Sequence, residues 1–240
     1  MSVFISYKRV KHADYFASRL LKLCQLLNMS QKDKLVYFDL RARGEAIRML
    51  YVLANRELVE DRHDPTQWKT IKPTLDLPLG QMPILTTEDG ALCLSNTICR
   101  YIAKKFGLLG EGLWNETLND LVVETFQEFL NHMVTKISSW KFRKWRPEPE
   151  NSAEILEEVW HYLKKRLEYV EAIAEKKGKH HFILSDKIQL ADVWVYTTLE
   201  WAKRIYPDAM EMTEWTKEFV AKFQSDPVMK KYLAERPETD

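Results

Sequence analysis

The spacing of apolar positions predicts alternating strands and helices over residues 34–106. The apolar period in this stretch switches repeatedly between two residues and three to four. The expected elements are strands at 34–38 and 57–61, helices at 43–54 and 66–72, and two strands around the Glu-Asp-Gly turn of "MPILTTEDGALCL". A last helix is expected from Ser95, as its N-cap, to Phe106. The order β-α-β-α-β-β-α indicates a small mixed sheet covered by helices.

Beyond Gly107 the pattern is helical. Apolar residues recur at helical spacing in four stretches, at about 118–134, 155–170, 189–206 and 213–224. Two prolines, Pro147 and Pro149, separate the first stretch from the second. We therefore expect an α/β domain over 34–108, followed by an all-helical bundle over 113–240.

Residues 1–33 form an extension before these two domains. The extension is basic, with Asp14 the only acid before residue 33, and four of its apolar residues recur at helical spacing: Phe16, Leu20, Leu23 and Leu27. A basic amphipathic segment of this kind is typical of a mitochondrial targeting peptide, and an accessory helix is the alternative. A domain that begins near Met29 would leave residues 1–28 dispensable.

Composition and charge exclude several classes of protein. With 240 residues and 45% hydrophobic content, the chain is long enough for two folded domains. The 36 Lys and Arg residues balance 35 Asp and Glu residues, so no overall field favours nucleic acid or an acidic membrane. Three cysteines, none in a C-x-x-C pair, argue against a disulfide framework or a zinc site and for a reducing compartment. No apolar run approaches the roughly 20 residues of a membrane span.

The stretch "VYFDLRARGEAIRML", residues 36–50, carries the candidate chemistry. A predicted strand ends in Tyr37 and Phe38, and two arginines, Arg41 and Arg43, stand at the mouth of the following helix. A tyrosine hydroxyl can donate a hydrogen bond without ionising, because its pKa is about 10, and a helix N-terminus attracts anions. The arrangement points to an anionic ligand.

Five segments in order make the chain resemble a cytosolic glutathione transferase from about residue 34 to its end. They are "KLVYFDLRARGEAIR", "QWKTIKPTLDLPLGQMPIL", "LSNTICRYIAKKFGLLG", "ILSDKIQLADVW" and "YLAERPETD". The first is similar to the opening of the sigma class, whose relatives include glutathione-dependent prostaglandin D synthases and S-crystallins. The resemblance implies a thioredoxin-like, glutathione-binding domain over 34–108 and a helical domain over 113–240.

The resemblance also implies that Tyr37 and Arg43 are catalytic. The thiolate of glutathione is the nucleophile, and an ordinary thiol with a pKa of about 8.5 is only a few per cent ionised at neutral pH. Tyr37 would donate a hydrogen bond to the sulfur, and Arg43 would orient the loop or polarise the region of the thiolate. Lowering the pKa of the thiol by about two units requires roughly 2.7 kcal/mol of preferential thiolate stabilisation.

Residues for both substrates follow from the same resemblance. Those for glutathione are Tyr37, Arg43, Trp68, Lys72, Gln81, Met82, Pro83, Ser95 and, from the partner in a dimer, Glu128. Met82–Pro83 would be a cis peptide, and Ser95 would hold the γ-glutamyl carboxylate with the helix N-terminus. Those for a hydrophobic co-substrate are Phe38, Leu130 and Met133. The ordinary alternatives are a solvated helix face for Glu128 and core packing for the apolar three.

Two positions depart from the family pattern. Leu94 stands where the family has Gln or Glu before the serine, so we expect weakened glutathione affinity. Gln189 stands where the family has Ser or Thr, three residues before Asp192, which puts the capping box that supports folding in doubt. The stretch "TLDLPLGQ" is also about two residues longer than the usual connection, which makes contacts from Gln81 less secure.

The resemblance implies a function in detoxification. A cytoplasmic homodimer that needs no metal would conjugate glutathione to a hydrophobic electrophile. One alternative is a prostaglandin isomerase that uses the same thiolate. Another is a non-catalytic structural protein comparable with the S-crystallins, favoured by Leu94 and the N-terminal extension but opposed by the retained Tyr37 and Arg43.

Overall fold

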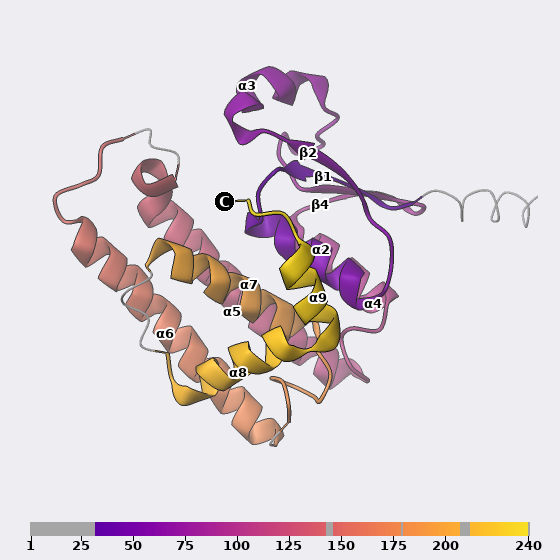
Figure 1. The fold of residues 1–240 in the computed structure, drawn as a ribbon, viewed down its shortest axis with the longest axis vertical. Helices are drawn as coiled ribbons and strands as arrows, with labels where there is room; N and C mark the ends of the chain where they lie inside the picture. The colour runs from indigo at the N-terminus through magenta and orange to yellow at the C-terminus, as the bar shows by residue number, and fades with distance from the viewer. Residues whose placement is uncertain (1–31, 143–145, 179, 207–211, 240) are drawn as a thin grey trace, which may run out of the picture.

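The computed structural model describes residues 32–142, 146–178, 180–206 and 212–239. The predictions for residues 1–31, a targeting peptide or an accessory helix, lie outside these ranges. The described chain forms a four-stranded sheet with helices, followed by an all-helical part (Figure 1). This architecture is the one predicted from the apolar pattern.

The sheet places Tyr37 near the end of an inner strand. It contains β1 (Lys34–Phe38), β2 (Val59–His63), β3 (Ile84–Thr87) and β4 (Gly90–Cys93), in the order β2-β1-β3-β4. β1 runs parallel to β2 and antiparallel to β3, which pairs antiparallel with β4. Alternation along β1 buries Leu35 and Tyr37 on one face, while Lys34 is exposed.

Two helices cover the sheet on the side of the second domain. They are α2 (Ala42–Leu53) and α4 (Ser95–Lys105), which pack against each other and lie between the sheet and the later helices (Figure 1). The short helix α3 (Trp68–Ile71) is flanked by 3-10 turns at Pro65–Gln67 and Lys72–Thr74. The predicted order β-α-β-α-β-β-α is confirmed, although β2 begins at Val59 rather than at residue 57, because Val59 is the partner of Lys34 in the parallel register.

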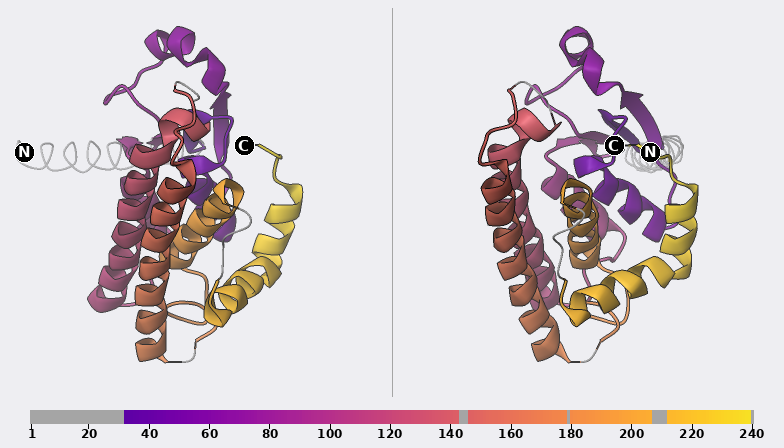
Figure 2. Two further views of the ribbon diagram at one scale, coloured as in Figure 1. Left: turned by 90° about the vertical axis from the view of Figure 1, so that its left-hand side faces the viewer. Right: turned by 60° about the vertical axis from the view of Figure 1, so that its left-hand side comes forward.

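The second domain is helical, as predicted. Its helices are α5 (Leu113–Ile137), α6 (Ser152–Lys177), α7 (Leu190–Ile205), α8 (Glu214–Ser225) and α9 (Pro227–Glu235), with a π-helical turn at Ser138–Phe142 after α5. The apolar pattern did not predict α9, which packs against α2 and brings the C-terminal segment back to the first domain (Figures 1 and 2). Among the helices that the structure describes, none is both long and apolar enough to span a membrane.

A buried polar cluster holds the start of α7. Asp192 accepts the backbone N–H of Gln189 over 2.7 Å and that of Ile183 over 2.9 Å. Asn119 on α5 accepts the backbone N–H of Ala191 over 2.9 Å and donates to the side chain of Gln189 over 2.8 Å. Gln189 and Asp192 thus form the capping box that the missing Ser or Thr had put in doubt, so that expectation was wrong. Asn119, from another helix, supplies a further acceptor at the start of α7.

Candidate active site

The hydroxyl of Tyr37 lies where β1 meets α2. The residue is only 6% exposed. The backbone N–H of Arg43, in the first turn of α2, donates a hydrogen bond to the hydroxyl oxygen over 3.2 Å. Because the oxygen is the acceptor in this contact, the hydroxyl proton remains available for a second partner.

The environment of Tyr37 keeps its hydroxyl protonated. Burial raises the pKa of Tyr37 above 10, and the N–H of Arg43 and the positive charges of Arg43 and Arg48 oppose this shift only in part. A neutral hydroxyl is a hydrogen-bond donor, whereas a phenolate would repel an anion. At neutral pH the site therefore presents a donor to any anion that binds beside it.

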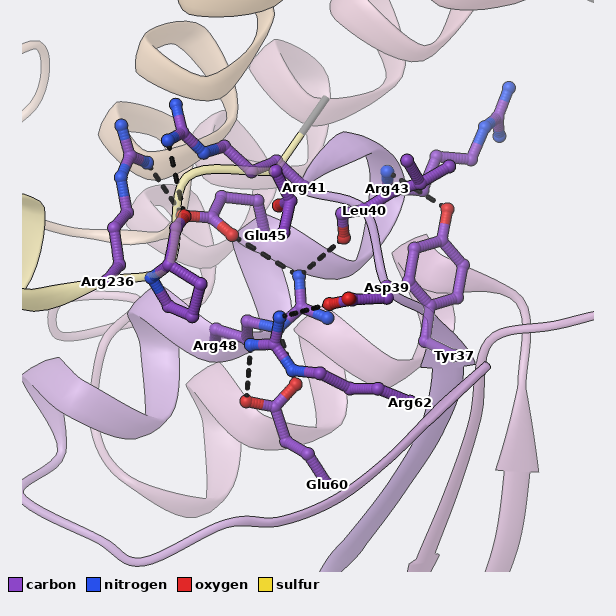
Figure 3. A network of polar contacts seen from close by, with 12 residues as sticks. Tyr37, Asp39, Leu40, Arg41, Arg43, Glu45, Arg48, Glu60, Arg62 and Arg236 are labelled. Atoms are coloured by element: carbon purple, nitrogen blue, oxygen red, sulfur yellow. Dashed lines mark hydrogen bonds and ion pairs between the residues drawn. The ribbon is translucent and has the colours of Figure 1, made fainter. Parts of the chain in front are cut away.

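The guanidinium of Arg43 points away from Tyr37 (Figure 3). It donates to Oδ1 of Asn131 on α5 over 3.1 Å, and Gln127 donates to the same oxygen over 2.8 Å. Burial lowers the pKa of Arg43 from its high ordinary value, and Tyr37 opposes this. Among the residues that the structure describes, no carboxylate forms an ion pair with Arg43, so a positive charge without a counterion lies at the boundary of the two domains.

A network of ion pairs behind α2 fixes the loop that precedes the helix. Arg48 donates to the carbonyl oxygen of Leu40 over 2.8 Å and to Glu60 on β2 over 2.6 Å (Figure 3). Glu45 is buried and accepts from Arg48 over 3.3 Å and from Arg236, near the C-terminus, over 2.6 Å. The position of the loop therefore depends on β2 and on the C-terminal segment.

Phe38, Trp68 and Lys72 lie beside one another. The ring centroids of Phe38 and Trp68 are 5.1 Å apart in an edge-to-face arrangement, and the ammonium of Lys72 lies 5.6 Å from the Trp68 centroid. Phe38 is also 5.6 Å from Tyr37, centroid to centroid. The structure therefore brings together four of the residues predicted for the site, and their contacts with substrates remain predictions.

The Met82–Pro83 peptide bond is cis, as predicted. It leads directly into β3, where Ile84 pairs with Val36 on β1. Extended by two residues, this antiparallel register places residue 82 opposite Phe38, the last residue of β1. Gln81 is exposed, and its contact with glutathione stays a prediction.

The helix α4 begins at Ser95, and the N-cap position is taken by Leu94, so the prediction of Ser95 as the N-cap was wrong by one residue. Ser95 is buried, whereas Leu94 is 48% exposed and has a φ of +71°. This left-handed conformation favours glycine or asparagine and is costly for leucine. The helix N-terminus that was predicted to bind a carboxylate is thus present, with an exposed apolar side chain at its mouth.

Glu128 and its neighbour one turn earlier are engaged in ion pairs within the chain. Glu128 is largely exposed and lies 3.6 Å from the guanidinium of Arg166 on α6. Glu124 pairs with Arg100 on α4. The role predicted for Glu128 requires a partner subunit, and it remains a prediction.

Leu130 and Met133 are both almost fully buried. Met133 lines a small apolar cavity among α5, α6 and α7, together with Phe129, Val159 and Ile205. These positions fit core packing, one of the two interpretations left open by the apolar spacing. Contact of Leu130 or Met133 with a co-substrate remains a prediction.

Three residues that shape the site were not predicted: Gly44, Asn131 and Arg236. Gly44 and Arg236 lie in two of the segments that carry the family resemblance, "RARGE" and "AERPETD". The sequence does not indicate which residues they contact. Asn131 carried no signal, because its partner Arg43 lies 88 positions away. In the described part of the chain, no group of three or more His, Cys, Asp or Glu side chains could hold a metal ion.

Comparison with known families matches both parts of the chain. The family described as "Glutathione S-transferase, N-terminal domain" matches residues 34–104, and "Glutathione S-transferase, C-terminal domain" matches residues 131–236. Glutathione S-transferase 3 of Caenorhabditis elegans is 30% identical over 213 residues, which cover 86% of this chain and 97% of the relative. Glutathione S-transferase 1 of Ascaris suum is 28% identical over 208 residues, with the same coverage of both chains.

Solved structures are similar in fold. Na-GST-3, described as a monomeric glutathione S-transferase of the hookworm Necator americanus, is 26% identical with a TM-score of 0.76 over 88% of this chain and 100% of that chain. A glutathione S-transferase of Caenorhabditis elegans is 29% identical with a TM-score of 0.73 over 86% and 99%. Rat hPGDS complexed with a quinoline has a TM-score of 0.70 and 22% identity over 87% and 99%, which shows a shared fold alone.

Proposed function

Because the chain belongs to the glutathione S-transferase family, we propose that it activates the thiol of glutathione as a thiolate and conjugates it to hydrophobic electrophiles. Its enzyme class is glutathione transferase. The observation that carries the proposed mechanism is the 3.2 Å hydrogen bond from the backbone N–H of Arg43 to the hydroxyl of Tyr37. This bond holds the oxygen at the start of α2 and leaves the hydroxyl proton for the sulfur.

In this mechanism Tyr37 stabilises the thiolate as a neutral donor. Burial raises the pKa of Tyr37, so the hydroxyl does not act as a phenolate base, and the thiol proton goes to solvent. A hydrogen bond to a charged sulfur contributes about 1.5–3 kcal/mol, which lowers the pKa of the thiol by about one to two units. The charge of Arg43, which has no carboxylate partner among the described residues, also favours the anion.

Glutathione is proposed to lie across the ends of β1 and β3 and the start of α4. Lys72 would attract the glycyl carboxylate, and Trp68 would donate its indole N–H. The backbone of Met82, turned by the cis bond to Pro83, would pair with the cysteinyl amide, with Gln81 nearby. Ser95 and the N-terminus of α4 would bind the γ-glutamyl carboxylate.

The second substrate is proposed to be hydrophobic and to lie near Phe38, with Leu130 and Met133 behind it. The opening segment around Tyr37 supports kinship with the sigma class. A cytoplasmic role in detoxification is part of the same proposal, because conjugation to glutathione makes apolar electrophiles more polar.

Two assays on the purified chain test the proposed function. Retention on immobilised glutathione measures binding, and a thiol-conjugation assay with an activated aromatic electrophile measures turnover. We expect retention and turnover together. Retention without turnover, or the absence of both retention and turnover, would refute the proposed conjugation. Either result would favour a structural role of the S-crystallin kind.

We predict that the protein is a homodimer. The first helix of the bundle, α5, carries large apolar side chains outside the core: Leu113 is 82% exposed and Trp114 is 68% exposed. Exposed apolar side chains that lie together are typical of a protein–protein interface. Light scattering at micromolar concentration should give twice the chain mass of 28.5 kDa. A monomeric mass, as described for Na-GST-3, would contradict the dimer and remove Glu128 from the site.

Replacing Leu94 with glutamine is predicted to tighten glutathione binding by about two- to tenfold. Glutamine restores one neutral hydrogen bond at the mouth of α4, and such a bond contributes about 0.5–1.5 kcal/mol. The backbone cost of the +71° φ is similar for Leu and Gln, so it should not offset the gain. Calorimetric titration compares the two forms. Equal affinity would show that residue 94 lies outside the pocket.

A further inference from the structure

Gly44 lies directly against the ring of Tyr37. A β-carbon built on Gly44 would lie 2.4 Å from Cδ1 and 2.8 Å from Cε1 of the ring. Carbon atoms that are not bonded rest at about 3.5–4.0 Å, so any side chain at position 44 would displace the ring. Gly44 is a residue of α2, and its φ is not in the left-handed region. Glycine is therefore required here for space and not for backbone conformation.

The ring of Tyr37 has little freedom to move aside. It is buried, it contacts Phe38 edge-to-face, and the guanidinium of Arg48 lies 6.0 Å from its centroid. Its hydroxyl accepts the backbone N–H of Arg43, the residue directly before Gly44. Figure 3 shows the Tyr37 hydroxyl beside the start of α2 at Arg43. The N–H donor and the glycine that contacts the ring are thus consecutive residues of one backbone segment.

We propose that Gly44 is a positioning residue for the Tyr37 hydroxyl. The absent side chain lets the ring lie on the backbone of α2, and this contact sets the distance from the hydroxyl oxygen to the N–H of Arg43. The proposal rests on the proposed function, since the hydroxyl that Gly44 positions is the one that stabilises the thiolate. Alanine is the better helix former, so a purely structural role would not favour glycine at this position.

The Gly44→Ala variant tests the inference through the pH dependence of turnover. We expect kcat at pH 7 to fall by about tenfold, the acidic limb of the pH profile to move to higher pH, and KM for glutathione to change little. The loss should not exceed that of Tyr37→Phe, because Gly44 acts only through the tyrosine hydroxyl. An unchanged kcat and pH profile would overturn the inference.

A double-mutant cycle separates positioning from a general effect on the site. In the Tyr37→Phe background the hydroxyl is absent, so adding Gly44→Ala should change kcat by less than about twofold. An equal loss in both backgrounds would overturn the proposal. The matched control is Ala42→Gly, two positions earlier in α2, where φ is +29° and glycine relieves the backbone. We expect the control to leave the pH profile unchanged.

A crystal structure of Gly44→Ala without ligand measures positioning independently of catalysis. We expect the distance from the Tyr37 hydroxyl to the Arg43 nitrogen to exceed 3.2 Å. An unchanged distance overturns the inference, whereas a longer distance in a protein that shows no conjugation refutes the proposed function alone. If the Gly44→Ala variant does not fold, the double variant Tyr37→Leu with Gly44→Ala should fold, because the ring that the new β-carbon would meet is absent. If neither variant folds, the inference is overturned.

Discussion

Replacing Tyr37 with phenylalanine is expected to lower kcat by about one to two orders of magnitude at neutral pH. In the proposed mechanism the substitution removes one hydrogen bond to a charged sulfur, which contributes about 1.5–3 kcal/mol. Each 1.36 kcal/mol corresponds to a tenfold change in rate. The ring and its contacts with Gly44 and Phe38 are kept, so fold and glutathione affinity should be nearly intact. Steady-state kinetics with saturating glutathione measures the change.

The pH dependence gives this prediction a definite sign. Burial raises the pKa of Tyr37, so the hydroxyl stays protonated between pH 6 and 9 and the acidic limb of the profile reports the thiol of bound glutathione. Removing the donor destabilises the thiolate and should move that limb upward by about one to two units. The variant should therefore recover activity as pH rises.

A matched control for Tyr37→Phe is Tyr169→Phe on α6. Tyr169 is 47% exposed, and its replacement by phenylalanine removes a tyrosine hydroxyl that is not part of the candidate site. We expect no change in kcat or in the pH profile of this control. An unchanged kcat in Tyr37→Phe at neutral pH would refute the catalytic assignment of Tyr37.

The fold was predictable from local patterns because each element carries its own signal. The strand that carries Tyr37 alternates between buried and more exposed positions, and the helix predicted near Ser95 is present, although its N-cap is Leu94 and not Ser95. The cis bond before Pro83 followed from the family resemblance and is present. The predicted start of β2, residue 57, was two residues too early. The register of a parallel pair is set by the neighbouring strand, so the local sequence does not indicate where the pairing begins.

Contacts between distant segments could not be predicted in the same way. The guanidinium of Arg43 contacts Asn131, 88 positions away, and Asn119 on α5 supports the capping box at the start of α7. No periodicity in a single sequence links such pairs, since each side chain alone is an ordinary polar residue. The arrangement of Tyr37, Phe38, Trp68 and Lys72 was accessible only because the family resemblance named all four.

Replacing Arg236 with methionine is expected to lower the free energy of unfolding by about 3–5 kcal/mol. Arg236 follows α9 and is only 7% exposed at its side chain. It donates to Glu45 over 2.6 Å and to Glu200 over 3.0 Å, and removing one partner of a buried ion pair leaves its carboxylates without full compensation. Although burial lowers the pKa of Arg236, its two carboxylate partners raise it above its ordinary value, so it is charged at every working pH.

Denaturation in urea, followed by the fluorescence of the eight tryptophans, measures this loss. The control is Lys217→Met, which breaks an exposed pair with Glu214 and should change stability by less than about 1 kcal/mol. Combining Arg236→Met with Glu45→Gln should recover part of the loss, because the glutamate that lost its cation is then neutral, while Arg48 keeps Glu60. Equal stability of Arg236→Met and Lys217→Met would show that the C-terminal segment does not hold α2 in place.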